Sequence, residues 1–128
     1  MEHSGKGILV VDDETAILQI VSEFLRHAGY TTIFTAPSAL AARKIWAEES
    51  ERISLIITDL VLPDGRGTLL ARDFLYANPK CRAIMMTGYS PEHVDLGGHL
   101  NERAVLLQKP FSAPDLLRLT NACLIPST

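Results

Sequence analysis

The sequence predicts an α/β fold, a doubly wound five-stranded parallel sheet with helices on both faces. Short runs of branched apolar residues, such as 8–11 and 55–57, are typical of strands buried on both faces. Segments with apolar residues at helical spacing alternate with these runs along the chain. Such alternation indicates parallel strands joined by right-handed helical crossovers, which restricts the topology to doubly wound orders.

The first half of the chain contains two strand–helix units. Residues 8–11 form the first predicted strand. The helix after it carries apolar residues at helical spacing, namely Ile17, Ile20, Val21, Phe24 and Ala28. Gly29 is well placed to end this helix, and the stretch 30–35 is the second predicted strand because it is rich in threonine, isoleucine and aromatic residues. Ala39, Ala42 and Trp46 mark a second helix.

The second half continues the alternation with three more units. The three strands are expected at 55–59, 83–86 and 104–107. A helix should follow each strand, over 67–77, from Pro91, and from Ser112 or Ala113. Asn78-Pro79 should end the first of these helices, and Gly97-Gly98 should keep the second short.

Length and composition fit a single domain over 1–128, with a core at about 7–124. The net charge of −3 and the scattered Lys and Arg residues give no electrostatic basis for binding nucleic acid. The sequence has no apolar run of membrane-spanning length and no signal-peptide core, so we expect no membrane association and a cytoplasmic location. Cys81 and Cys123 lack metal-ligand spacing and are typical of buried or half-buried thiols.

Polar residues stand where four of the predicted strands end, and they are Asp12, Asp13, Asp59, Thr87 and Lys109. Because parallel strands share one carboxyl edge, we expect these side chains to lie together. Three carboxylates repel one another and need a cation, and an oxygen-only set favours Mg²⁺ or Mn²⁺ over zinc. A hydroxyl and an ammonium group opposite a metal suit a phosphoryl group. The sequence therefore predicts a phosphoryl site with Asp59 as nucleophile.

Each of these residues also has a structural interpretation. An acidic pair such as Asp12-Asp13 is common at a helix N-terminus, and an aspartate at a strand end such as Asp59 is common in turns. We favour the phosphoryl site because the acids, the hydroxyl and the lysine occur together, each at a strand end.

The sequence resembles the receiver domains of two-component response regulators, from Ile8 to about Cys123. The matching motifs are Val10-Val11-Asp12-Asp13-Glu14, Asp59-Leu60-Val61-Leu62-Pro63 with Gly67, Thr87-Gly88 and Lys109-Pro110-Phe111. Each motif is weak alone, but together and in this order they are specific. The resemblance implies a flavodoxin-like receiver fold with strand order 2-1-3-4-5. The stretch Leu107-Gln108-Lys109-Pro110-Phe111 and the weak fourth helix are similar to receivers attached to hybrid sensor histidine kinases.

The resemblance implies a metal site at the acidic residues. Asp13, Asp59 and the backbone carbonyl of Val61 would coordinate Mg²⁺, and Asp12 would hold the ion mainly through water. Asp59 would also be the phosphoacceptor.

The resemblance also implies how the phosphoryl group is held. Thr87 would hydrogen-bond a phosphoryl oxygen and move with it. Lys109 would pair with the phosphate, and with Asp59 in the resting state. The bond between Lys109 and Pro110 is usually cis in the family.

Four further positions are candidates for regulating the site. Leu106 stands where the family usually has Tyr or Phe, which puts the usual switch of that aromatic residue in doubt. Tyr89 and Val61 flank the phosphate at positions that tune its lifetime in the family. Tyr89 is expected either to pack on the fifth strand or to gate the site. Leu18 lies about 80° from the centre of the first helix's apolar stripe, so it is either edge-of-core or a contact for the phosphodonor.

The leading functional hypothesis is a phosphoacceptor receiver of a two-component phosphorelay, which takes phosphate from a histidine kinase or a histidine phosphotransfer protein. It would not be a conventional enzyme, because it would catalyse only its own phosphorylation and dephosphorylation. A homodimer could form through the face of the fourth helix, fifth strand and fifth helix. Two alternatives stay open, a phosphorylation-independent interaction module and a Mg²⁺-dependent phosphohydrolase. The second would need another acid as proton donor, and Asp64 is poorly spaced for that role.

Overall fold

A computed structural model describes residues 6–90, 93–96, 100 and 102–124. The main sheet contains β1 (Gly7–Val11), β2 (Ile33–Ala36), β3 (Ile53–Asp59), β6 (Arg82–Thr87) and β7 (Ala104–Gln108). The helices are α1 (Thr15–His27), α2 (Ala39–Glu49), α3 (Gly67–Ala77) and α5 (Ala113–Leu124), with a 3₁₀ turn at Ser50–Arg52. Among the described residues, no helix is both long and apolar enough to cross a membrane.

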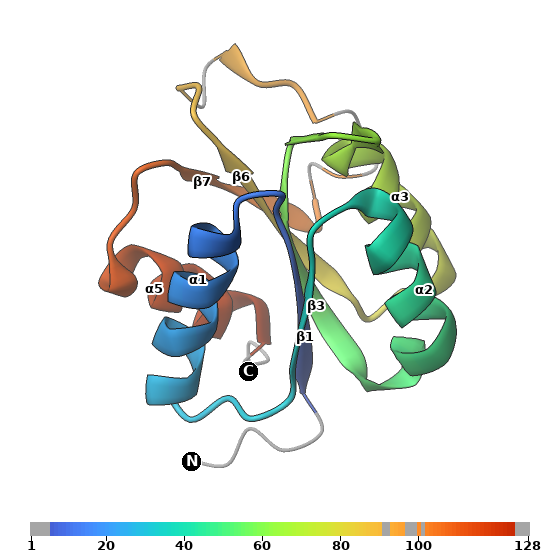
Figure 1. Cartoon of the computed structure of the whole chain (residues 1–128), viewed down its shortest axis with the longest axis horizontal. Helices are drawn as coiled ribbons and strands as arrows, with labels where there is room; N and C mark the ends of the chain where they lie inside the picture. Colours follow the sequence, from blue (N-terminus) through green and yellow to red (C-terminus); the bar gives the residue numbers. More distant parts are fainter. Residues whose placement is uncertain (1–5, 91–92, 97–99, 101, 125–128) are drawn as a thin grey trace.

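The main sheet is entirely parallel and has the order β2-β1-β3-β6-β7. This is the order 2-1-3-4-5 expected from the resemblance, once the separate hairpin described below is left out of the count. Helices α1 and α5 cover one face of the sheet, and α2 and α3 cover the other (Figure 1). The predicted fold class is therefore confirmed.

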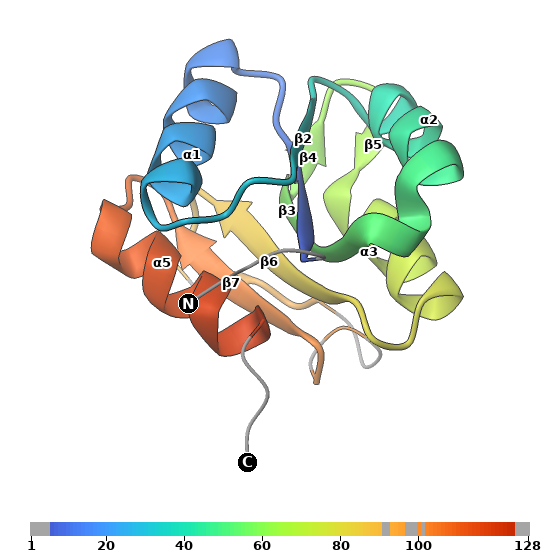
Figure 2. The same cartoon turned by 90° about the horizontal axis from the view of Figure 1, so that it is seen from below.

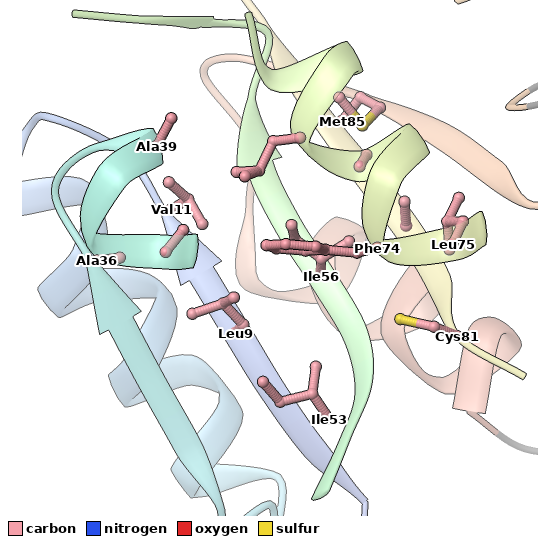
Figure 3. Close-up of a cluster of buried hydrophobic side chains, with 14 of the residues drawn as sticks. Leu9, Val11, Ala36, Ala39, Ile53, Ile56, Phe74, Leu75, Cys81 and Met85 are labelled. Carbon is pink, nitrogen blue, oxygen red and sulfur yellow. The ribbon is translucent and has the colours of Figure 1, made fainter. Parts of the chain in front are cut away.

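The strands alternate their side chains between two apolar cores. The core under α2 and α3 contains Leu9, Ile56 and Met85, and Phe74 packs on it from α3 (Figure 3). The core under α1 and α5 is formed by the intervening strand residues, such as Val10, together with residues of those two helices. Both faces of the central strands are buried, which explains why their sequences are continuous apolar runs.

The end of α1 shows why the second strand begins later than predicted. Gly29 has a φ of 99°, and it ends α1 as expected. The N–H of Tyr30 donates to the carbonyl of Leu25, and the N–H of Gly29 donates to that of Arg26, a pairing typical of a glycine helix stop. Tyr30 is thereby turned into the core, where its hydroxyl donates to Asn121 of α5. The prediction that the strand begins at Tyr30 was wrong, and β2 starts at Ile33. Tyr30 instead takes part in the hydrogen bonds that end α1, and its side chain packs in the core.

The apolar stripe of α1 also differs from the predicted one. Ile20, which the spacing placed in the stripe, is 42% exposed, whereas Leu25 is fully buried and Ser22 is 4% exposed. Leu18 is half-buried and packs against the core under α1 and α5, because it lies one helical turn before the buried Ser22. The structure therefore supports the edge-of-core interpretation of Leu18.

A short hairpin follows β3 that the sequence did not predict. It pairs β4 (Val61–Leu62) with β5 (Gly65–Arg66) in antiparallel orientation. Strands of two residues are too short to produce a recognisable alternating pattern. The fourth helix, expected from Pro91, involves residues 91–92, 97–99 and 101, which lie outside the described residues.

Candidate functional site

The polar residues at the strand ends meet at the carboxyl edge of the sheet. In the register, Val11 pairs with Thr58, Asp59 with Met86, and Thr87 with Gln108. Asp12 and Asp13 directly follow Val11, so they leave the sheet at the same level as Asp59. One carboxylate oxygen from each of Asp12, Asp13 and Asp59 lies within 4.8 Å of the other two.

Lys109 joins two of these carboxylates. Its Nζ lies 2.8 Å from Oδ2 of Asp12 and 3.0 Å from Oδ2 of Asp59. Burial by itself disfavours the charged ammonium, but the hydrogen bonds and negative charges of Asp12 and Asp59 outweigh it and raise the pKa of Lys109. The resting contact with Asp59 that the resemblance implied is present, and the contact with Asp12 is an additional finding. The bond between Lys109 and Pro110 is cis, as expected.

Asp12 is fixed from both sides. It is fully buried, and its Oδ1 accepts the N–H of Glu14 at 2.9 Å while Oδ2 accepts from Lys109. The bond from the N–H of Glu14 is a side-chain turn just before α1. The interpretation of the acidic pair as a helix cap was wrong, because the N-cap residue of α1 is Glu14 and no side chain caps it. Asp13, in contrast to the buried Asp12, is exposed.

Asp59 is a partly exposed carboxylate whose orientation is fixed by the backbone. Its side chain is 18% exposed, and its Oδ1 accepts the N–H of Val61 at 3.2 Å. The chain comes close to Asp59 again at Gly67, because a Cβ on Gly67 would lie 1.9 Å from the carbonyl oxygen of Asp59. Only glycine allows this approach. Gly67 belongs to the motif that follows Asp59, but nothing in the local sequence shows that the two residues touch.

Thr87 and Tyr89 lie on the neighbouring strand end. Thr87 is 2% exposed, and its Oγ1 accepts the N–H of Tyr89 at 2.9 Å. Tyr89 is 67% exposed, which does not agree with packing on β7. Its role as a gate stays a prediction. Leu106 is half-buried, opposite Met85 in the sheet, and packs against the core under α2 and α3.

The acidic cluster fits a hard divalent cation. All three groups are carboxylates, and ligands of Mg²⁺ about 2.1 Å from the ion lie roughly 3–4 Å apart, which is compatible with oxygens that lie within 4.8 Å of one another. The cluster carries three negative charges against the single ammonium of Lys109, so a further cation would relieve its repulsion. Val61, whose carbonyl is the fourth expected ligand, begins the exposed hairpin beside Asp59.

Asp64 lies at the turn of this hairpin and makes a contact with α2 that the sequence does not predict. Its carboxylate accepts the N–H groups of Ala39 and Leu40, the first two residues of α2. The sequence showed a turn at Pro63-Asp64-Gly65 but not its neighbour, because 24 or more residues separate the partners.

Comparison with known proteins agrees with this geometry. A family model described as "Response regulator receiver domain" matches residues 8–121. The receiver protein CpdR of Brucella abortus (strain 2308) is 28% identical over 94% of the chain and 98% of its own length. The sensor kinase CckA of the same organism is 28% identical over 85% of the chain, which spans only 11% of that kinase.

A solved structure shares the fold at higher identity. The CheY-like receiver domain protein from Methanospirillum hungatei JF-1 is 35% identical, with a TM-score of 0.79 and 93% of each chain covered. The sequence relatives therefore include a short receiver protein and a segment of a much longer kinase, and the solved structure shares the fold over 93% of the chain.

Proposed function

The chain belongs to the response regulator receiver domain family, and from that premise we propose that it accepts a phosphoryl group from a phosphohistidine onto Asp59. The observation that supports this most directly is the pairing of Lys109 with both Asp12 and Asp59 beside a third carboxylate. This arrangement supplies an accessible nucleophile and a fixed positive charge in one place, with room for a second cation.

The transfer would exchange one bond to phosphorus for another. A carboxylate oxygen of Asp59 attacks phosphorus, a new P–O bond forms, and the P–N bond to the donor histidine breaks with its electron pair returning to the imidazole. Bound Mg²⁺ would neutralise charge on the phosphoryl oxygens, and Asp12, Asp13, Asp59 and the Val61 carbonyl would hold it. Lys109 would leave its resting contact to pair with the transferred phosphoryl group, and the Thr87 hydroxyl would donate to one of its oxygens.

The partners and the output follow as proposals from the same chemistry. The donor would be a histidine kinase or a histidine phosphotransfer protein, and movement of Thr87 and Lys109 would alter the surface beside β6 and β7. Leu106 lacks the aromatic ring that usually moves with the threonine in this family, so its side chain should contribute less to that signal. The homodimer, the cytoplasmic location and the one-domain extent stay predictions.

The phosphohydrolase alternative loses its candidate proton donor. The N–H groups of Leu40 and Ala39 hold the pKa of Asp64 below its ordinary value. Asp64 is therefore ionised and engaged with α2, which is unsuitable for a general acid. The phosphorylation-independent alternative leaves the shared carboxylates and lysine without a role.

The test is phosphorylation by acetyl phosphate with Mg²⁺, followed by intact mass and amide NMR. We expect a mass increase of one phosphoryl group in the native chain, none in Asp59→Asn, and NMR shifts at Thr87 and Lys109 that vanish in the variant. Asp73→Asn, which changes an exposed acid on α3, is the matched control and should behave like the native chain. Equal labelling of Asp59→Asn would refute the assignment.

A further inference from the structure

The hairpin after β3 is tied to α2 at its turn. Pro63 and Asp64 connect its two strands. Oδ1 of Asp64 accepts the N–H of Ala39 at 2.8 Å, and Oδ2 accepts that of Leu40 at 2.9 Å. Figure 2 shows β4 and β5 beside the start of α2.

This contact suits the chemistry of a helix terminus. The first N–H groups of α2 have no partner within the helix, and the partial positive charge there favours a carboxylate. Ser38 caps the same terminus separately, because its Oγ accepts the N–H of Ala41 at 3.1 Å. Two side chains therefore cap one helix end, but only Asp64 belongs to the hairpin.

The other end of the hairpin touches the phosphorylation site. The N–H of Val61 donates to Oδ1 of Asp59, and the N–H of Gly67 donates to the carbonyl of Leu60 at 2.8 Å. The hairpin has only two residues in each strand, and such a short pair is not stable by itself. Its conformation must therefore depend on its attachments, namely the backbone at Asp59, the burial of Leu62 and the contact of Asp64.

We propose that Asp64 is a positioning residue for the phosphorylation site, which holds the hairpin against α2 and thereby fixes Val61 beside Asp59. Asp64 would act on the site through Val61, because the N–H of Val61 orients the nucleophile and its carbonyl is proposed to bind the metal. The inference rests on the proposed function, since it concerns how that site is kept in order. It makes α2 part of the support of the site, although α2 supplies none of its charged groups.

The chain offers a matched pair of variants that separates positioning from helix stability. Asp64→Ala removes a cap of α2 together with the tie to the hairpin, whereas Ser38→Ala removes a cap of α2 alone. Each should lower the thermal midpoint, because loss of an N-terminal cap destabilises a helix. Mg²⁺ binding, followed by amide NMR without any phosphodonor, is the discriminating measurement.

We expect Asp64→Ala to weaken Mg²⁺ binding about tenfold, in the range seen when groups that orient metal ligands are removed. Ser38→Ala should stay within about twofold of the native chain, since its hydroxyl is not attached to the hairpin. The Mg²⁺ affinity of Asp64→Asn should lie between those of Asp64→Ala and Ser38→Ala, because the amide has one acceptor oxygen where the carboxylate has two. Asp64→Asn also serves as the second variant if Asp64→Ala folds poorly.

Equal Mg²⁺ affinity in Asp64→Ala and Ser38→Ala, with native NMR shifts at Val61 and Asp59 in both, would overturn the inference and leave the proposed function standing. Failure of the native chain to bind Mg²⁺ would overturn both, so the two failures are distinguishable.

Discussion

The two ends of β7 each carry one basic residue, and the structure uses them for different purposes. Arg103, just before the strand, donates to the carbonyls of Leu75, Asn78 and Cys81 at 2.7–2.8 Å. Lys109, just after the strand, pairs with the carboxylates of Asp12 and Asp59.

The difference lies in what surrounds each charge. The oxygens around Arg103 are neutral main-chain groups that close the loop between α3 and β6, so the residue secures a connection. Lys109 contacts charged carboxylates, and its single ammonium group faces a cluster of three of them. That end of the strand therefore keeps an excess of negative charge. At the end with Arg103, three guanidinium hydrogen bonds hold the loop, although the buried Nε of that residue has no partner among the described residues. At the end proposed to react, an excess of negative charge remains that a divalent cation would offset.

The largest expected effect is at Lys109. Lys109→Met should slow phosphorylation of Asp59 by acetyl phosphate about a hundredfold, because one positive group facing the phosphoryl oxygens is lost. It should also lower the thermal midpoint without metal, since the buried Asp12 would lose its ammonium partner, and Mg²⁺ should restore part of that loss. Intact mass and thermal unfolding measure the two effects. Native phosphorylation kinetics in Lys109→Met would contradict the role of this lysine.

Arg103 should behave in the opposite way. Arg103→Met should lower the free energy of unfolding by about 2 kcal/mol, because three carbonyls lose a charged donor. Mg²⁺ should not offset this loss selectively, and phosphorylation of the folded protein should stay close to native. Arg72→Met, which changes an exposed arginine on α3, is the control and should cost less than about 0.5 kcal/mol. A phosphorylation defect in Arg103→Met as large as in Lys109→Met would remove the contrast between the two ends.

Asp13 tests the charge imbalance directly. Asp13→Asn should raise the free energy of unfolding by about 0.5 kcal/mol in metal-free buffer, because one of three clustered negative charges is removed from an exposed position. The same change should weaken Mg²⁺ binding, so the native chain should gain more stability from added Mg²⁺ than the variant does. Chemical denaturation with and without Mg²⁺ measures both. Lower stability of Asp13→Asn without metal would mean that the acids do not repel one another appreciably.

The smallest effect is the pH dependence of the lysine contact. Because Asp12 and Asp59 raise the folded-state pKa of Lys109 above 10.5, the charged lysine contributes stability that is fully present below that value. The contribution is lost as the pH rises through the folded-state pKa. The difference in thermal midpoint between the native chain and Lys109→Met should therefore shrink only in strongly alkaline buffer. A difference that disappears already at neutral pH would contradict the raised pKa.

The strands and the polar edge could be predicted from the sequence because both depend on local patterns. An uninterrupted apolar run such as 55–57 is typical of a strand buried on both faces, and Asp59 stands at the end of that strand. Gly29 ends α1 because glycine adopts a positive φ without strain, a property of the residue itself. The joint placement of the acids and Lys109 then follows from the common direction of parallel strands.

Other features were decided by contacts between distant parts of the chain. Tyrosine is a residue type that strands favour, but Tyr30 packs in the core beside α5 and is not part of β2. The buried side of α1 is set by the sheet below it, so Ile20 is exposed although its spacing agrees with the stripe.

The sequence by itself determined the order of the elements and which residues stand at the reactive edge, since periodicity and strand direction are properties of neighbouring residues. The tertiary structure alone decided which partners each charged group meets. Arg103 hydrogen-bonds to backbone carbonyls, and Asp64 to the N-terminus of α2. In both cases the partners are 22 to 28 residues apart in the sequence. Hydrogen bonds and charge interactions depend on distance in space, and only the folded chain brings those partners within range.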